Sequence, residues 1–336
     1  MTHQSFHLGD IRLQSGHDIP DAVLAYQTHG ALNSARDNAI IYPTSFAATH
    51  KDAAWLIGPG RALDPDRYFI IIPNALGAGL SSSPSNRPAS MAGDSFPPVT
   101  IRDNVLQQHR LVTERFGIDR LHMAIGWSLG GSQAFEWASA FPDQVERLFT
   151  FQSAARTSRH FSIFFDSVRA AIMQDSEFRN GLYIRQPERG LRTAARIYAA
   201  WGFSQAFFRR RLDETALGYA SMEDFLTDFW EGWFLKRDAN NLLAQIWTGQ
   251  HADISANEIY QGDLDRALGS IQADAIIMPA SSDLYFPIAD AAEEAKRIPG
   301  AELRVLETDW GHVAGEGLNE ADTAALEQSI SDLLRR

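Results

Sequence analysis

The chain has 336 residues, 45% of them hydrophobic, which suffices for one large α/β domain with an insertion or for two ordinary domains. Its 30 Lys and Arg against 42 Asp and Glu leave a net charge of −12. This charge argues against nucleic acid or an anionic membrane as the main partner, since both bind clustered cations. The absence of cysteine excludes disulfides, thiolate metal sites and a cysteine nucleophile.

The first residues, MTHQSFHLGDIRLQSG, lack the cationic and apolar regions of a signal peptide. No apolar run approaches the roughly 18 residues that a membrane-spanning helix needs. We therefore expect a cytoplasmic protein with a small-molecule substrate and no membrane partner.

The first part of the chain alternates between strand and helix patterns. Residues 6–16 and 21–30 alternate apolar and polar side chains, which predicts an antiparallel strand pair. The apolar runs that follow predict buried strands, and the longer periodic segments predict helices. The strands are expected at 39–46, 68–77 and 121–127, and the helices at 101–118 and 131–142. Such alternation predicts a mostly parallel sheet with helices on both faces.

Aromatic and charged residues dominate from about residue 151 to residue 260, where we predict a mainly helical insertion. The α/β pattern then returns, with strands expected at 273–283 and 301–307 and helices at 290–298 and 322–334. The predicted division is a first core part at 1–150, the insertion at 151–260 and a second core part at 261–336.

A serine lies between two glycines in the stretch AIGWSLGG, residues 124–131. A strand pattern precedes it and a helix pattern follows, so the serine occupies a tight strand-to-helix turn. Gly126 and Gly130 remove side chains that would collide with a strained serine, and Gly131 lets the helix approach the sheet. We interpret Ser128 as a nucleophile. An ordinary turn serine is the alternative.

A serine hydroxyl needs a base, commonly a histidine that a carboxylate orients. On this kind of turn the acid and then the histidine follow the serine in the chain. His160 and His251 lie in the insertion, which leaves His312, on a loop after the last strand. Asp283 follows an apolar strand at the carboxyl edge of the sheet, where ligand sites form. We predict Ser128, Asp283 and His312 as a catalytic triad, with a turn aspartate and a surface histidine as the alternatives.

An oxyanion intermediate requires preorganised backbone N–H groups. We expect one donor at Leu129, the residue after the nucleophile. The other is placed at Phe46, in the loop PTSFAATH that follows the strand AIIY. Thr44 and Ser45 of the same loop could be plain turn residues.

Several longer stretches of the sequence resemble those of a known protein family. They are FHLGDIRLQSG, DPDRYFIIIPNALGAGLSSSPSN, FPPVTIRDNVLQQHRLV, GWSLGGSQAFEWASAFPDQVERL, and SSDLYFPIADAAEEAKRIPGAEL with WGH. Through them nearly the whole chain resembles the homoserine O-acetyltransferase family, a branch of the α/β-hydrolase superfamily. The resemblance implies an α/β-hydrolase fold with a helical lid and a ping-pong mechanism through an acyl-serine. It also implies a homodimer formed through the lid.

The chain departs from this family directly after His312. The acyltransferases typically have an aspartate there that helps to hold the amino group of homoserine, whereas this chain has Val313. An isopropyl group cannot pair with an ammonium group, and burying that cation unpaired is costly. We therefore favour a hydrolase of a small ester, thioester or amide. An O-acetyltransferase that uses acetyl-CoA is the alternative, and a non-catalytic ligand-binding homologue is a minor one.

Four residues are candidates for substrate contact. Trp127 and Trp310 flank Ser128 and His312 in the sequence, and Val313 replaces the aspartate. Arg209 belongs to the cationic cluster FFRRRLD, which could recognise a carboxylate or the phosphates of coenzyme A. Core packing for the tryptophans and a solvated helix face for the arginines are the alternatives. No metal-ligand spacing or dinucleotide fingerprint is visible, so we expect no required cofactor.

Overall fold

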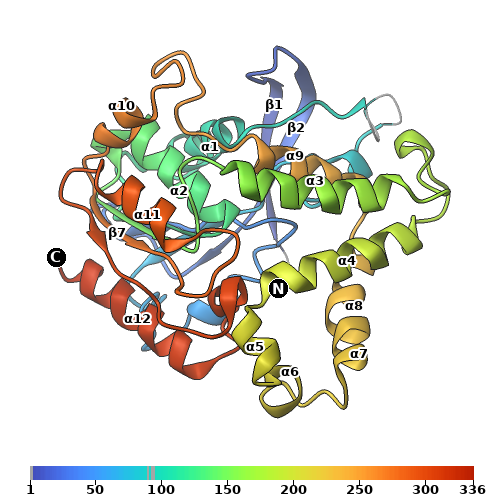
Figure 1. Ribbon diagram of the computed structural model, residues 1–336. Helices are drawn as coiled ribbons and strands as arrows, with labels where there is room; N and C mark the ends of the chain where they lie inside the picture. The colour runs from blue at the N-terminus through green and yellow to red at the C-terminus, as the bar shows by residue number, and fades with distance from the viewer. Residues whose placement is uncertain (1–2, 89–90, 92–94) are drawn as a thin grey trace.

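A single eight-stranded sheet lies at the centre of the computed structural model, which describes residues 3–88, 91 and 95–336 (Figure 1). The strands are Gln4–Arg12 (β1), Asp18–His29 (β2), Ala39–Ile41 (β3), Phe69–Pro73 (β4), Met123–Trp127 (β5), Arg147–Phe151 (β6), Asp274–Met278 (β7) and Glu302–Leu303 (β8). Their order in the sheet is β1-β2-β4-β3-β5-β6-β7-β8. The pairs β1–β2 and β2–β4 are antiparallel, and all other pairs are parallel.

The sheet confirms the expected fold class, a mostly parallel sheet covered by helices. Its central strands are completely buried, as the apolar runs predict. Several predicted strands are shorter in the structure, β3 for example ending at Ile41, and two differences are larger. β6 was not predicted, because five apolar-rich residues next to an aromatic helical region fit a strand or a helix equally well. β8 has two residues rather than seven, and Leu306 adds an isolated bridge to Ala280.

The core helices lie close to their predicted positions. They are Ile101–Arg110 (α1), Leu129–Ala140 (α2), Ile288–Ala295 (α11) and Glu320–Leu334 (α12). α1 ends earlier than the periodicity predicts, and Leu111–Arg115 continue it as a π-helical turn. α2 packs on β5 and β6, and α12 packs on β6 and β7. Because β5, β6 and β7 pair in parallel, their carboxyl ends share one edge of the sheet.

Helices fill the chain between β6 and β7. They are Arg159–Met173 (α3), Glu188–Gly202 (α4), Gln205–Arg209 (α5), Leu212–Thr215 (α6), Met222–Phe225 (α7), Gly232–Leu235 (α8), Ala239–Gln250 (α9) and Leu264–Gly269 (α10). α3 to α8 gather on one side of the molecule, at the right and bottom of Figure 1. Arg156 donates from Nε to Asp253 at 2.7 Å and so joins the two ends of this region. The three-part division of the chain stays a prediction.

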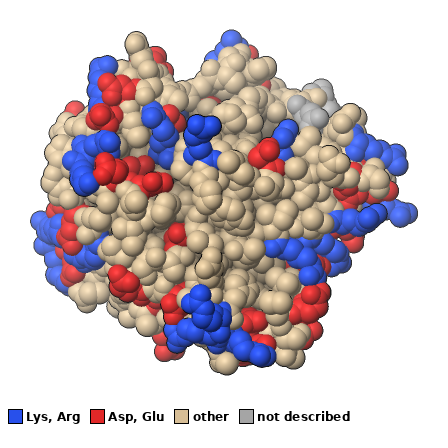
Figure 2. All heavy atoms as spheres, viewed as in Figure 1, with Lys and Arg blue, Asp and Glu red and all other residues tan. Residues whose placement is uncertain are grey.

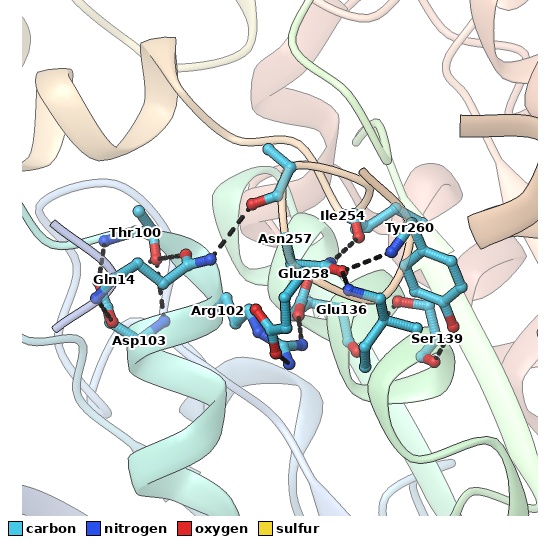
Figure 3. Close-up of polar contacts among 12 residues, drawn as sticks. Gln14, Thr100, Arg102, Asp103, Glu136, Ser139, Ile254, Asn257, Glu258 and Tyr260 are labelled. Atoms are coloured by element: carbon cyan, nitrogen blue, oxygen red, sulfur yellow. Dashed lines mark hydrogen bonds and ion pairs between the residues drawn. The ribbon is translucent and has the colours of Figure 1, made fainter. Parts of the chain in front are cut away.

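Two ion pairs of one arginine tie α1 and α2 to the chain that follows α9 (Figure 3). Arg102 of α1 donates to Glu136 of α2 at 3.1 Å and to Glu258 at 2.7 Å. Burial raises the pKa of Glu136 to about 7, and Arg102 opposes the shift. Tyr260 adds a hydrogen bond from its hydroxyl to the Ser139 carbonyl at 2.6 Å. The end of the helical region is thus anchored on the core.

Within the described part of the chain, no helix combines the length and the apolar character needed to cross a bilayer. The same residues contain no cluster of three or more His, Asp or Glu side chains arranged to hold a metal ion.

Candidate active site

Ser128 lies on a sharp turn between β5 and α2. Its backbone has φ 55° and ψ −130°, a conformation that a non-glycine residue rarely adopts. A Cβ atom at Gly126 would lie 2.2 Å from the Gly130 carbonyl oxygen, and one at Gly130 would lie 2.4 Å from the Pro43 carbonyl oxygen. One at Gly131 would lie 2.5 Å from the Ser153 side chain. The three glycines therefore let the turn approach the neighbouring backbone and hold the serine at its tip.

The structure brings the three predicted triad residues together, although they are far apart in the sequence. His312 Nε2 lies 2.9 Å from Ser128 Oγ, and His312 Nδ1 lies 2.8 Å from Asp283 Oδ2. All three side chains are buried. The second carboxylate oxygen of Asp283 accepts from the backbone N–H groups of Tyr285 and Phe286, at 2.7 and 3.3 Å. The carboxylate is thus fixed on one side by the backbone and orients the imidazole on the other.

His312 lies in a short 3-10 helix, Gly311–Glu316, rather than in the irregular loop that the sequence predicts. Gly311 and Gly315 allow tight packing in this segment. A Cβ atom at Gly315 would lie 2.2 Å from Trp127 Nε1, and Gly311 has φ +65°. This segment is a compact turn that presents the histidine from the carboxyl edge of the sheet.

The two residues predicted to supply oxyanion donors lie beside the serine. Leu129 is the first residue of α2, and Phe46 lies in the loop after β3. Among the described residues, neither backbone N–H donates to a protein acceptor. Gln133 holds the loop in place by donating to the Thr44 carbonyl at 3.0 Å, and Ser45 donates to the Trp127 carbonyl at 2.7 Å. This lack of a protein acceptor is what the predicted oxyanion role requires of both N–H groups.

A cavity of about 240 Å³ opens onto Ser128 and His312. Aromatic side chains from the lid helices form much of its wall, including Tyr198, Phe229, Trp230 and Trp233. Phe46 stacks on Tyr198 and Trp233, with ring centroids 5.7 and 6.3 Å apart. Side chains from the region between β6 and β7 therefore form part of the cavity wall and contact the loop that carries Phe46.

The four residues considered for substrate contact divide into two groups. Trp127 and Val313 line the cavity, and the Trp127 ring stacks on His312 with centroids 4.9 Å apart. Trp310 is buried and packs against Phe207, outside the cavity wall.

Arg209 is exposed at the end of α5 and is not part of the cavity wall. Its neighbours are paired with acids, since Arg210 contacts Asp309 and Arg211 contacts Glu214. Cationic and anionic side chains likewise lie next to one another on the face in Figure 2. The position of Arg209 favours the solvated helix face over contact with the substrate.

Sequence analysis did not single out Gln152, which directly follows β6 at the carboxyl edge of the sheet. It is completely buried, and its backbone has φ +49°. Its Nε2 group donates to the carbonyl oxygens of both Gly311 and His312, each at 2.9 Å. One amide thus holds the backbone that carries the histidine. In the sequence, Gln152 follows an apolar run, and this position could have drawn attention to it. That run was not predicted to be the strand β6.

Gln152→Leu should lower kcat by about 10- to 100-fold with little change in KM, because loss of both donors lets His312 shift from Ser128. Gln245→Leu is a matched control, since Gln245 is also buried and donates to a backbone carbonyl, that of Leu76, at 2.8 Å. Steady-state kinetics on a small ester and the melting temperature of both variants test this. Equal losses of kcat in the two variants would show that Gln152 has no special role for the histidine.

Three charged residues that sequence analysis also missed line the same cavity: Asp52, Arg237 and Glu316. Arg237 donates from Nε to the Ala47 carbonyl at 3.0 Å and from Nη1 to the Trp233 carbonyl at 2.7 Å. Burial lowers its pKa to about 10. Burial raises the pKa of Glu316 to about 7; Asp52 adds to that shift, and the charge of Arg237 opposes it. Glu316 is four residues after His312, a spacing that could have drawn attention to it.

Comparison with known proteins agrees with this architecture. Residues 39–316 match the family model described as alpha/beta hydrolase fold. The chain belongs to the α/β-hydrolase family and is an enzyme of that fold.

Three relatives are most informative about where the chain lies within the family. Ethyl acetate hydrolase of Pseudomonas veronii is 39% identical over 331 residues, which cover 98% of this chain and 94% of that protein. The solved structure of the acetyl esterase MekB superposes with a TM-score of 0.97 at 38% identity and covers 100% of this chain and 97% of that one. A homoserine O-acetyltransferase of Thermobifida fusca is 32% identical and covers 89% of this chain and 86% of that protein.

Proposed function

We propose that this chain is a serine esterase that hydrolyses small esters through an acyl-serine intermediate. The observation that carries the proposal is the continuous hydrogen-bonded arrangement of Ser128, His312 and Asp283 at the floor of a small, largely aromatic cavity. The similarity to ethyl acetate hydrolase and to an acetyl esterase supports ester bonds with short acyl groups as substrates.

In the first half-reaction Ser128 Oγ attacks the ester carbonyl carbon and its proton moves to His312 Nε2. The carbonyl oxygen becomes an oxyanion that the backbone N–H groups of Phe46 and Leu129 stabilise. Asp283 stabilises the imidazolium through Nδ1. The intermediate collapses, the C–O bond to the alcohol breaks, and His312 returns the proton to the leaving oxygen. Water then attacks the acyl-serine by the same steps and releases the acid. These steps use the chain's own groups and require no cofactor.

Acetyl transfer from acetyl-CoA to an alcohol is the second candidate, and similarity to homoserine O-acetyltransferases favours it. The two functions differ in the acceptor of the second half-reaction. Val313, which lies in the cavity wall, supports water over homoserine because it offers no charge to an ammonium group.

The experiment that tests the proposal follows the acyl-enzyme by mass spectrometry in the wild-type chain and in Ser128→Ala. We expect ethyl acetate and p-nitrophenyl acetate to be turned over without an added acceptor. A transient acetyl adduct of about 42 Da should appear on Ser128. Turnover of acetyl-CoA that needs homoserine would instead identify a transferase. No reaction of Ser128 with a fluorophosphonate probe would favour a non-catalytic binding protein.

A homodimer formed through the lid stays a proposal, as does a cytoplasmic location. Exposed apolar side chains on and beside the lid helices support the dimer. They are Ile163, Leu182, Ile184 and Met222, with exposed fractions from 55% to 98%. Light scattering of the purified protein would give its mass in solution and so decide between monomer and dimer.

A further inference from the structure

The wall of the cavity contains more acidic side chains than guanidinium groups. Asp52, Arg237 and Glu316 come from three separate segments and contribute two acidic side chains and one guanidinium to the wall. Glu316 is four residues after His312 in the same 3-10 helix and belongs to the wall of the cavity that opens onto Ser128.

The guanidinium of Arg237 already makes hydrogen bonds and a ring contact within the protein. Two backbone carbonyls accept its hydrogen bonds, and its Cζ atom lies 3.3 Å from the centroid of the Trp233 ring. Among the described residues, no ion pair joins it to Asp52 or Glu316. It therefore ties the lid to the oxyanion loop and neutralises the cavity only in part.

Glu316, by contrast, faces the cavity without a fixed partner. Among the described residues, its carboxylate takes part in no hydrogen bond or ion pair. An unpaired carboxylate in a narrow cavity with a largely aromatic wall repels a second negative charge more strongly than it would in water. It imposes no comparable cost on a neutral ester.

We propose that Glu316 determines the charge selectivity of the site, so that the enzyme accepts neutral esters and rejects esters that carry a carboxylate near the reacting bond. This rests on the proposed esterase function and adds the class of substrate. It also counts against acyl donors with negative charge close to the acyl group. Asp52 contributes the second carboxylate, nearer the solvent.

The raised pKa of Glu316 gives the selectivity a pH dependence with a definite sign. Below about pH 7 the side chain is neutral and the repulsion is weak, whereas above pH 7 it is charged and the repulsion is present. The groups that interact with it electrostatically are Asp52, Arg237, Tyr198 and Tyr285, and His312 lines the same cavity. Burial lowers the pKa of Arg237 to about 10 and raises that of Tyr198, so neither changes charge between pH 6 and 8.5.

The test uses acetoxyacetamide and acetoxyacetate, two acetyl esters of similar shape that differ by one negative charge. The measured quantity is the ratio of kcat/KM for the neutral ester to that for the anionic ester. The ratio removes any effect of pH that is common to the two esters. We expect the ratio to increase about five- to tenfold between pH 6 and pH 8.5 in the wild type.

Glu316→Gln should abolish that increase and lower the ratio at pH 8.5 by about the same factor. The matched control is Glu320→Gln, which removes an exposed carboxylate four residues further along and outside the cavity wall, and should retain the wild-type ratio. A ratio that is independent of pH in the wild type, or unchanged in Glu316→Gln, would overturn the proposal. Failure to hydrolyse either ester would instead overturn the esterase function.

Discussion

Replacing Asp283 with asparagine should lower kcat for a small neutral ester by about 10⁴-fold while leaving the fold intact. Asp283 has one oxygen 2.8 Å from His312 Nδ1 and another that accepts two backbone N–H groups. If the asparagine amide faces Nδ1, it donates there and forces the proton to Nε2, which can no longer accept from Ser128. If it faces the backbone, its hydrogens meet the N–H groups of Tyr285 and Phe286. Either orientation loses the base or leaves buried donors unpaired.

Initial rates with p-nitrophenyl acetate, together with the melting temperature, measure this effect. Asp290→Asn is a suitable control because Asp290 is an exposed acid in the first turn of α11 and lies outside the cavity wall. It should change kcat by less than about twofold, as most surface substitutions have small effects. If Asp283→Asn retains a tenth or more of the wild-type kcat, the triad assignment fails.

Gly126→Ala should lower the free energy of unfolding by about 3 kcal/mol, because added volume at a close-packed site forces a backbone shift. The new Cβ atom would lie 2.2 and 2.3 Å from the carbonyl oxygen and carbon of Gly130 and 2.5 Å from the Gly131 nitrogen. All three atoms are backbone, so no side chain can rotate away. The turn that holds Ser128 must move, and we expect a loss of activity in the folded fraction as well.

Gly232→Ala provides the control for this substitution. Gly232 begins α8 with φ −59°, and an added Cβ atom would have its nearest contact at 3.7 Å, an ordinary separation. Alanine there should stabilise the protein by up to about 1 kcal/mol, since it favours helix and restricts the unfolded chain. Urea unfolding of both variants measures the difference. Equal stabilities would show that the turn tolerates a side chain and that the Gly126 argument is wrong.

The turn that carries Ser128 could be predicted from the sequence because the residues that determine it are adjacent in the chain. A strand, a strained serine and a helix occupy consecutive residues, and the glycines at 126, 130 and 131 are needed within the same few ångströms. Asp283 and His312 were predicted from chain order and from their place after strands, which a parallel sheet brings to one edge. The parallel sheet itself followed from the alternation of apolar runs and helical periods.

The rest of the site depended on which distant segments meet. Gln152 was missed because a five-residue strand carries too short a pattern to distinguish it from helix. Asp52, Arg237 and Glu316 lie in separate segments whose local patterns show polar residues but not their common cavity. The sequence neighbours Trp310 and Val313 have different environments, one packed against Phe207 and the other in the cavity wall.

The amino-acid sequence alone therefore determined the fold class, the strained serine and the order of the residues expected to activate it. The periodicity of apolar residues indicates which side of each helix or strand is buried. Glycines indicate where the backbone passes close to another segment. Only the tertiary structure decided the charge and size of the cavity and the support of the histidine backbone. Those properties arise from contacts between segments more than 100 residues apart, such as Arg237 with Ala47 and Gln152 with His312, which no local period encodes.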